Sequence, residues 1–208
     1  MGIEADLLEV NPVTGRRTGL AVDARRALRA LKGAAVPHAV IGAAALAARG
    51  LPRMTKDLDI VVLVEDAFRA LEALSRAGFR SMTPIDRAAE PDAMYVLRHG
   101  RAGGEVDVLV ASGEPESTVV AEATRAMVFG AAAPVATLQH LVLMYLYSNQ
   151  PRHFGDLARI VTETAVDLGE VEKYLAEVHP EMLPVLAERV HAARHPLPPP
   201  PRPTRRRR

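Results

Sequence analysis

The sequence contains no cysteine and few aromatic residues. Without cysteine, the chain can form no disulfide, no thiolate metal site and no thiol nucleophile. Phe, Trp and Tyr together make up 4% of the 208 residues, so the core has to be built mainly from Ala, Leu and Val. Apolar residues still reach 49%, which is typical of a globular protein with a sizeable core.

Long apolar runs and a strong net charge are missing as well. No stretch approaches about 18 consecutive apolar residues, so we expect no membrane span and no membrane partner. The first residues, MGIEADLLEV, lack the basic and apolar segments of a signal peptide, and we therefore expect a cytoplasmic protein. The net charge is only +1, which indicates no general affinity for nucleic acid or membranes.

Composition and periodicity divide the chain into four parts. Residues 1–20 are expected to be irregular, and the low-complexity Pro/Arg-rich tail 196–208 to be disordered, because it cannot bury a core. Residues 21–112 mix helical and strand patterns, whereas residues 113–195 are mostly helical, with one candidate short strand within 125–136. The expected fold class is α+β, with a mixed-sheet core followed by a C-terminal helical region.

Local patterns predict the elements of the core. Apolar residues at helical spacing predict a helix over 22–31, and GAAALAARG (42–50) predicts a second one. The β-branched segment HAVIG (38–42) predicts a buried strand. DLDIVVLV (57–64) is the clearest strand, and its continuous apolar run indicates burial on both faces.

Further along the chain, Asp66 is a candidate cap for a helix whose inner face would hold Phe68, Leu71 and Leu74. The segments AMYVLRH (93–99) and GEVDVLVA (104–111) predict two antiparallel strands. The helical half has four candidate helices, over 137–148, 153–165, 169–179 and 181–193.

Three acidic residues lie on or beside these strands: Asp57, Asp59 and Asp107. Positions i and i+2 of a strand face the same side, so Asp57 and Asp59 can point at one spot, and a neighbouring strand can bring Asp107 there. Converging carboxylates favour a hard cation such as Mg²⁺. The alternative is a turn residue at Asp57 and a solvated carboxylate at Asp59. Acidic residues within apolar strands are costly unless paired or liganded, which favours the metal site.

The segment VIGAAALAARGLPRMTKDLDIVV resembles the signature of the nucleotidyltransferase superfamily related to DNA polymerase β. That signature is a strand, a pair of small residues at a helix start, Asp-x-Asp on the next strand and a third acidic residue later. Gly42 and Ala43 match the small pair, Asp57 and Asp59 match Asp-x-Asp, and Asp107 matches the third acidic position. The R-x-T motif that precedes Asp-x-Asp, formed by Arg53 and Thr55, is similar to that of bacterial AbiEii-like toxins and related nucleotidyltransferases.

The resemblance implies a metal-dependent enzyme that moves a nucleoside monophosphate from an NTP, such as ATP, onto a hydroxyl acceptor. It implies two Mg²⁺ ions on Asp57 and Asp59, with Asp107 sharing one ion and assisting deprotonation. It also implies a tRNA, a protein or a small molecule as acceptor, and a toxin–antitoxin role with an antitoxin partner. The candidate nucleotide-binding residues are Gly42, Ala43, Arg53, Thr55 and Lys56.

Two departures from the pattern support an alternative, a catalytically inactive binding module of the same fold. Ala43 stands where Gly or Ser is usual, and Met144 and Tyr145 stand where relatives often carry a lysine on a helix. Some candidate residues also have simpler interpretations. Arg53 and Lys56 can be exposed charges, and Arg152 and Asp156 in the family-like stretch RHFGDLARIV border the cleft or form a pair on one helix.

Overall fold

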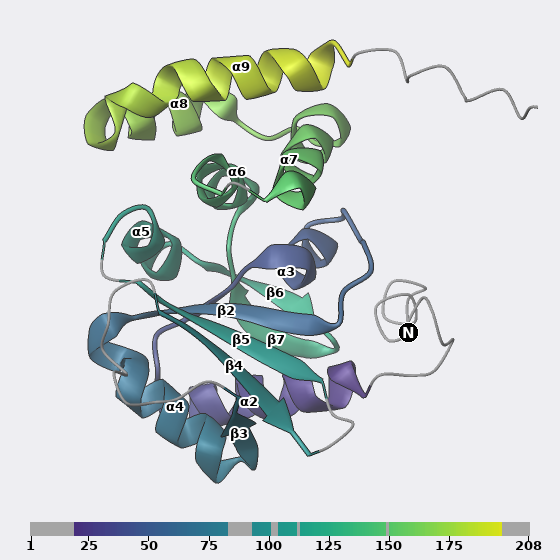
Figure 1. The fold of residues 1–208 in the computed structure, drawn as a ribbon, viewed down its shortest axis with the longest axis vertical. Helices are drawn as coiled ribbons and strands as arrows, with labels where there is room; N and C mark the ends of the chain where they lie inside the picture. Colours follow the sequence, from purple (N-terminus) through teal and green to yellow (C-terminus); the bar gives the residue numbers. More distant parts are fainter. Residues whose placement is uncertain (1–18, 83–92, 101–103, 112, 149, 197–208) are drawn as a thin grey trace, which may run out of the picture.

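A mixed β-sheet forms the centre of the computed structural model, which describes residues 19–82, 93–100, 104–111, 113–148 and 150–196. Nearly all of the segment 1–20 and of the tail 196–208, for which irregular and disordered structure is predicted, lies outside the described residues. Figure 1 shows helices on both faces of the sheet and further helices stacked beyond one of them. The predicted α+β class, with a mixed sheet followed by helices, is confirmed.

The sheet has the strand order β3-β4-β5-β2-β1-β7-β6. Strand β2 pairs in parallel with β5, and β1 pairs in parallel with β7, whereas the other neighbours are antiparallel. Both faces of β2 are covered, as its apolar run predicts, because Ile60, Val61 and Val62 are fully buried. The strands are β1 (Ala39–Val40), β2 (Asp57–Leu63), β3 (Phe79–Ser81), β4 (Met94–His99), β5 (Glu105–Ala111), β6 (Thr124–Val128) and β7 (Ala131–Val135).

Two helices, α2 (Leu20–Gly33) and α4 (Ala67–Arg76), cover one face of the sheet (Figure 1). On the other face lie α3 (Gly42–Ala48) and α5 (Glu116–Ala121), which both contact β2. Beyond them come α6 (Leu138–Leu146) and α7 (Pro151–Glu163), and then α8 (Leu168–Val178) and α9 (Leu183–Arg194). Short 3-10 turns at Val64–Asp66 and Pro180–Met182 precede α4 and α9.

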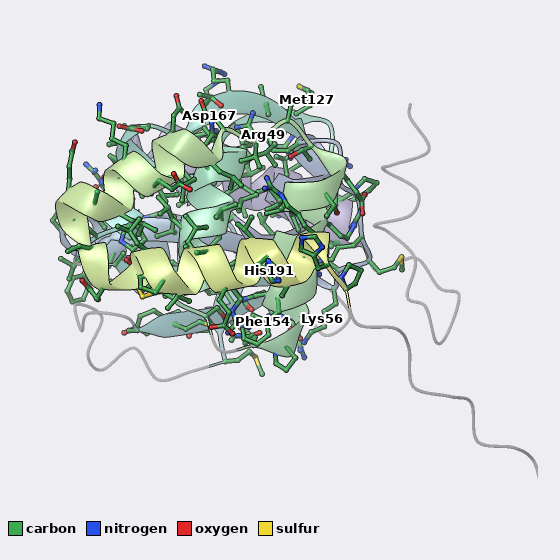
Figure 2. The ribbon with its side chains drawn as sticks, turned by 90° about the horizontal axis from the view of Figure 1, so that it is seen from above. Arg49, Lys56, Met127, Phe154, Asp167 and His191 are labelled. Atoms are coloured by element: carbon green, nitrogen blue, oxygen red, sulfur yellow. The ribbon has the colours of Figure 1, made fainter. Side chains whose placement is uncertain are left out.

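The helical half is held together by caps and by packing between its helices. Thr137 caps α6 by accepting the backbone N–H of His140 at 3.2 Å, and Asp167 caps α8 by accepting from Gly169 at 2.9 Å. The guanidinium of Arg189 in α9 lies 3.8 Å from the ring centre of Phe154 in α7. Figure 2 shows α9 as the outermost helix on this side, with Phe154 beside it.

The structure departs from the sequence predictions in several places. Residues 125–136 contain most of a two-stranded hairpin rather than one strand, because Phe129 and Gly130 both take positive φ values and turn the chain back. This hairpin joins the sheet, which therefore extends past the boundary predicted at residue 112. Phe68 is 63% exposed, so its predicted place on the inner face of α4 is wrong. That face is formed by Ala67, Ala70, Leu71 and Leu74.

The predicted hairpin of 93–99 and 104–111 is confirmed, with Val96 opposite Asp107 in the antiparallel pair β4–β5. The strand predicted over 38–42 is reduced to Ala39–Val40, because Gly42 already begins α3. Within the described residues, no helix combines the length and apolar character that crossing a membrane requires.

Arg49 fastens the end of α3 to the β6–β7 hairpin. Its guanidinium donates to the carbonyl oxygens of Ala136 at 2.9 Å and Val135 at 2.7 Å, and to the hydroxyl of Thr124 at 2.6 Å. In Figure 2, Arg49 and Met127 of β6 lie on the same side of the molecule. These hydrogen bonds connect the end of α3 to the edge of the sheet that β6 and β7 form.

Replacing Arg49 with Ala is expected to lower the free energy of unfolding by about 2 kcal/mol or more, because several charge-assisted hydrogen bonds are lost. Urea denaturation followed by circular dichroism measures this change. The matched control is Arg29→Ala on the exposed side of α2, which should change stability by no more than about 0.5 kcal/mol. Equal stability of both variants would contradict the role given to Arg49.

Candidate functional site

The parallel pairing of β2 with β5 brings the three predicted aspartates together. Asp59 and Asp107 are direct partners in the register, and Asp57 lies two residues before Asp59 on the same face of the strand. One carboxylate oxygen from each residue lies within 4.8 Å of those of the other two. Asp57 is buried and the other two are half-buried, so the cluster does not lie on open surface.

Burial and mutual repulsion work against ionisation of this cluster. Burial, together with the negative charges of Asp57 and Asp107, raises the pKa of Asp59 to about 7. Burial, with the charges of Asp57 and Glu105, raises the pKa of Asp107 to about 6. The positive charge of Arg152 opposes both shifts. When the three carboxyl groups are ionised, the nearby positive charges of the protein do not fully compensate their negative charge.

The hydrogen bonds of the cluster leave acceptor capacity unused. The Thr55 hydroxyl donates to Oδ1 of Asp57 and fixes that carboxylate. Oδ1 of Asp107 is buried and has no hydrogen-bond partner among the described residues. A buried carboxylate oxygen without a donor is costly unless a ligand supplies the missing contact. Three carboxylates with an unmatched oxygen fit a hard divalent cation such as Mg²⁺.

Gly42 makes room for the cluster at the start of α3. Its φ is +62°, a left-handed conformation that favours glycine, and a Cβ placed there would lie 2.1 Å from Oδ2 of Asp59. The first residue of the small pair therefore has to be glycine, because the Asp59 carboxylate lies where a side chain would be. The second member, Ala43, is fully buried and does not line the pocket, so its side chain serves packing.

The aspartates form part of the wall of a pocket of about 220 Å³ between the sheet and helices α6 and α7. The sheet contributes the carboxylates and an apolar surface, while the helices contribute aromatic and polar side chains. The described lining residues are Ile41, Gly42, Arg53, Asp57, Asp59, Ile60, Met94, Asp107, Leu109, Glu116, Leu141, Met144, Tyr145, Tyr147, Ser148, Gln150, Arg152 and His153. The pocket thus joins residues more than 100 positions apart in the sequence.

Two arginines give the pocket its positive charge. Arg53 lies in the wall and donates through Nε to Oδ2 of Asp156 in α7 at 3.0 Å. This ion pair connects the loop before β2 to the helical half, so Asp156 does not pair within its own helix. Arg152, one turn earlier in α7, also lines the pocket. Together they favour an anionic ligand beside the carboxylates.

Lys56 does not line the pocket. Its ammonium group pairs with Glu105 at 3.1 Å, and its side chain is 73% exposed. The hydrogen bond with Glu105 raises the pKa of Lys56 above its usual value. Lys56 is thus an exposed charge, which is one of the two interpretations that the sequence allowed. Figure 2 shows Lys56 on the side of the molecule opposite Arg49.

Apart from Arg152, which the sequence offered as a residue bordering the cleft, sequence patterns did not indicate the part of the wall that α6 and the start of α7 supply. Tyr145 stood out only as a replacement for an expected lysine, yet it lines the pocket and is 3% exposed. Its ring stacks on His153 with the centroids 4.7 Å apart. His153 in turn contacts the Ser148 hydroxyl at 2.6 Å through Nδ1. Burial lowers the pKa of His153, which favours the neutral ring.

Comparison with known proteins adds fold neighbours but no family. The sequence matches no protein family and no curated protein. The structure is similar to ANT(2″)-Ia in complex with adenylyl-2″-tobramycin, with 17% identity and a TM-score of 0.48 over 83% of this chain and 97% of that chain. It is also similar to the lincosamide antibiotic adenylyltransferase LnuA, with 11% identity and a TM-score of 0.49 over 69% of this chain and 97% of that chain.

A third similar structure is JHP933 from Helicobacter pylori, with 17% identity and a TM-score of 0.43 over 81% of this chain and 69% of that chain. All three TM-scores are below 0.5, so these neighbours do not establish an activity for this chain. The resemblance to AbiEii-like toxins stays a prediction from the sequence. The function has to be inferred from the residues of the pocket.

Replacing Gly42 with Ala is expected to lower the free energy of unfolding by about 2 kcal/mol or more, because the left-handed backbone is strained and the new methyl group displaces the Asp59 carboxylate. Urea denaturation measures the loss. Gly33→Ala at the end of α2 is the matched control, since a Cβ at this glycine would meet no atom within 4 Å and its φ is not in the left-handed region. A Gly42→Ala protein as stable as this control would refute the close approach.

Saturating Mg²⁺ or Mn²⁺ is expected to raise the Tm by about 3 °C, because a bound cation relieves the repulsion among the three carboxylates. Differential scanning fluorimetry at pH 8 measures the shift. Asp107→Asn should lose most of it, whereas Glu72→Gln on the exposed surface of α4 should retain it. Equal shifts in both variants would mean that the cation binds elsewhere.

Proposed function

We propose that this protein is a metal-dependent nucleotidyltransferase that moves a nucleoside monophosphate from an NTP onto a hydroxyl acceptor. The observation that carries the proposal is the cluster of Asp57, Asp59 and Asp107, whose oxygens lie within 4.8 Å of one another in a pocket wall that also holds Arg53 and Arg152. Carboxylates for a cation and guanidinium groups for phosphates are the two parts that phosphoryl transfer needs.

The three aspartates divide two tasks in this reaction. Asp57, fixed by the Thr55 hydroxyl, and Asp59, seated against Gly42, would hold the metal. Charge stabilisation of the attacking and leaving oxygens is the chemistry that two Mg²⁺ ions supply in such a site. Asp107, whose Oδ1 is buried without a hydrogen-bond partner among the described residues, would share the metal site and take up the proton of the acceptor hydroxyl. The acceptor oxygen bonds to the α-phosphorus, and the bond from the α-phosphorus to pyrophosphate breaks.

The remaining candidate residues serve the nucleotide. Arg53 lines the pocket and is held by Asp156, so its guanidinium is fixed in place for a phosphate. Gly42 lines the pocket and leaves its backbone open to the ligand. Thr55 acts through Asp57, and the contacts predicted for Ala43 and Lys56 stay predictions.

The proposed reaction is compatible with three classes of acceptor. A tRNA end, a protein and a small molecule each offer a hydroxyl, and a toxin with an antitoxin partner would use one of the first two. Incubation with the four radiolabelled NTPs, total tRNA and cell lysate separates these acceptors by the size and chemistry of the labelled product. A product sensitive to ribonuclease indicates RNA, and one sensitive to protease indicates protein.

Asp57→Ala is expected to reduce label transfer by about 100-fold or more, because one of the main electrostatic stabilisers is removed. The rate of product formation from the labelled NTP measures the loss. The control is Glu72→Ala, which removes an exposed carboxylate on α4 and should leave the rate unchanged.

The label-transfer assay, combined with isothermal titration of the NTP, tests the inactive binding module that Ala43 and the missing helix lysine suggest. NTP binding in isothermal titration, without labelled product from any acceptor in wild type, would support the module over the enzyme. Absence of NTP binding with Mg²⁺ would overturn both.

A further inference from the structure

Tyr145 places a buried hydroxyl in the wall of the pocket. The residue is 3% exposed, and its hydroxyl oxygen has no hydrogen bond to any described residue. Tyrosine hydroxyls usually find a partner when they are buried, because an unsatisfied polar group in the interior is costly. Arg53 and Asp59 line the same pocket, and Asp156 pairs with Arg53, so charged groups lie near this hydroxyl. The missing partner is therefore expected to be a ligand.

The tyrosine is fixed in this place by packing rather than by its hydroxyl. Its ring stacks on His153, with the ring centroids 4.7 Å apart and the planes inclined by 26°. The helix that carries it is held at its start by Thr137, which caps α6. Burial raises the pKa of Tyr145 above its usual value, so the hydroxyl keeps its proton and acts as a donor.

Arg152 supplies an uncommitted positive charge in the same pocket. It lines the pocket from the first turn of α7 and forms no hydrogen bond or ion pair within the described residues. Arg53 differs, because its Nε is bound to Asp156 and its Nη1 to the carbonyl of Met54. Arg152 lines the same pocket as Asp59 and Asp107, and its charge lowers the pKa of both carboxyl groups.

We propose that Tyr145 and Arg152 together bind the triphosphate of the nucleotide, in place of the helix lysine that this chain lacks. The inference rests on the nucleotidyltransferase function proposed above. A lysine offers a positive charge and N–H donors in one group, whereas here a neutral O–H donor and a charged guanidinium lie on two different helices. Tyr145 provides a directed neutral donor from α6, and Arg152 provides charge and several N–H donors from α7. The replacement of the lysine is thus compatible with an active enzyme.

The hydroxyl is tested by Tyr145→Phe, which keeps the ring and its stacking on His153. Titration calorimetry with Mg²⁺ measures the Kd of an α,β-methylene NTP, which cannot transfer its nucleotide, and of the matching NMP. We expect about tenfold or weaker binding of the NTP analogue and unchanged binding of the NMP, because a hydrogen bond to a charged group is lost. The Tm of the nucleotide-free protein should be unchanged or higher, because an unsatisfied group has been removed.

The charge is tested by Arg152→Ala, which should also weaken the NTP analogue about tenfold or more and spare the NMP. Arg152→Lys should restore part of the affinity, because it restores the charge without the planar fork. Two controls remove the same groups elsewhere: Tyr174→Phe, whose hydroxyl donates to Glu114 at 2.8 Å outside this pocket, and Arg29→Ala on α2. Both should bind the NTP analogue as wild type does.

The outcomes separate this inference from the function on which it rests. If wild type binds no NTP with Mg²⁺, the proposed function fails and this inference fails with it. If wild type binds the NTP analogue and the Tyr145→Phe and Arg152→Ala proteins bind it equally well, only the inference is overturned. It is also overturned if NTP and NMP lose affinity equally, or if Tyr145→Phe lowers the Tm of the nucleotide-free protein.

Discussion

The repulsion among three carboxylates is the constraint on which the site depends. The parallel register of β2 and β5 sets Asp59 directly beside Asp107, and the two-residue period of the strand adds Asp57. No arginine or lysine among the described residues forms a salt bridge with any of the three. Their negative charge is thus left for a ligand to compensate. Gly42, Thr55 and the buried flanks of β2 all serve to hold this unfavourable arrangement in place.

Much of the core could be predicted from the sequence because its signals are local. The apolar run of 57–64, the hairpin of 93–99 and 104–111, and the period-two placement of Asp57 and Asp59 each follow from neighbouring residues. The position of Asp107 beside Asp59 depends on the register between β2 and β5, which local patterns left open. The resemblance implied only that Asp107 is the third acidic residue of the site. Phe68 was misplaced because its helical spacing is that of a buried residue, whereas small alanines form much of the actual inner face of α4.

Most of the pocket wall formed by α6 and α7 could not be predicted, since it is made by contacts distant in the sequence. Tyr145 lies in a helix with apolar residues on all sides, where no period distinguishes a pocket residue from a core residue. Asp156 gave no sign of its partner, because Arg53 lies 103 positions earlier in the chain. The hairpin of β6 and β7 was underestimated because its alanine-rich second strand, AAAPV, has weak strand propensity.

The ion pair between Arg53 and Asp156 has a consequence for how this protein can diversify. It joins the loop before β2, next to the carboxylate cluster, to the helices that form the opposite wall of the pocket. Substitutions in α6 and α7 at positions other than Tyr145 and Arg152 can therefore reshape the pocket without disturbing the strands beneath it. With this division, the bound ligand can change during evolution while the carboxylate cluster is kept, and the helical layer is the place to engineer selectivity.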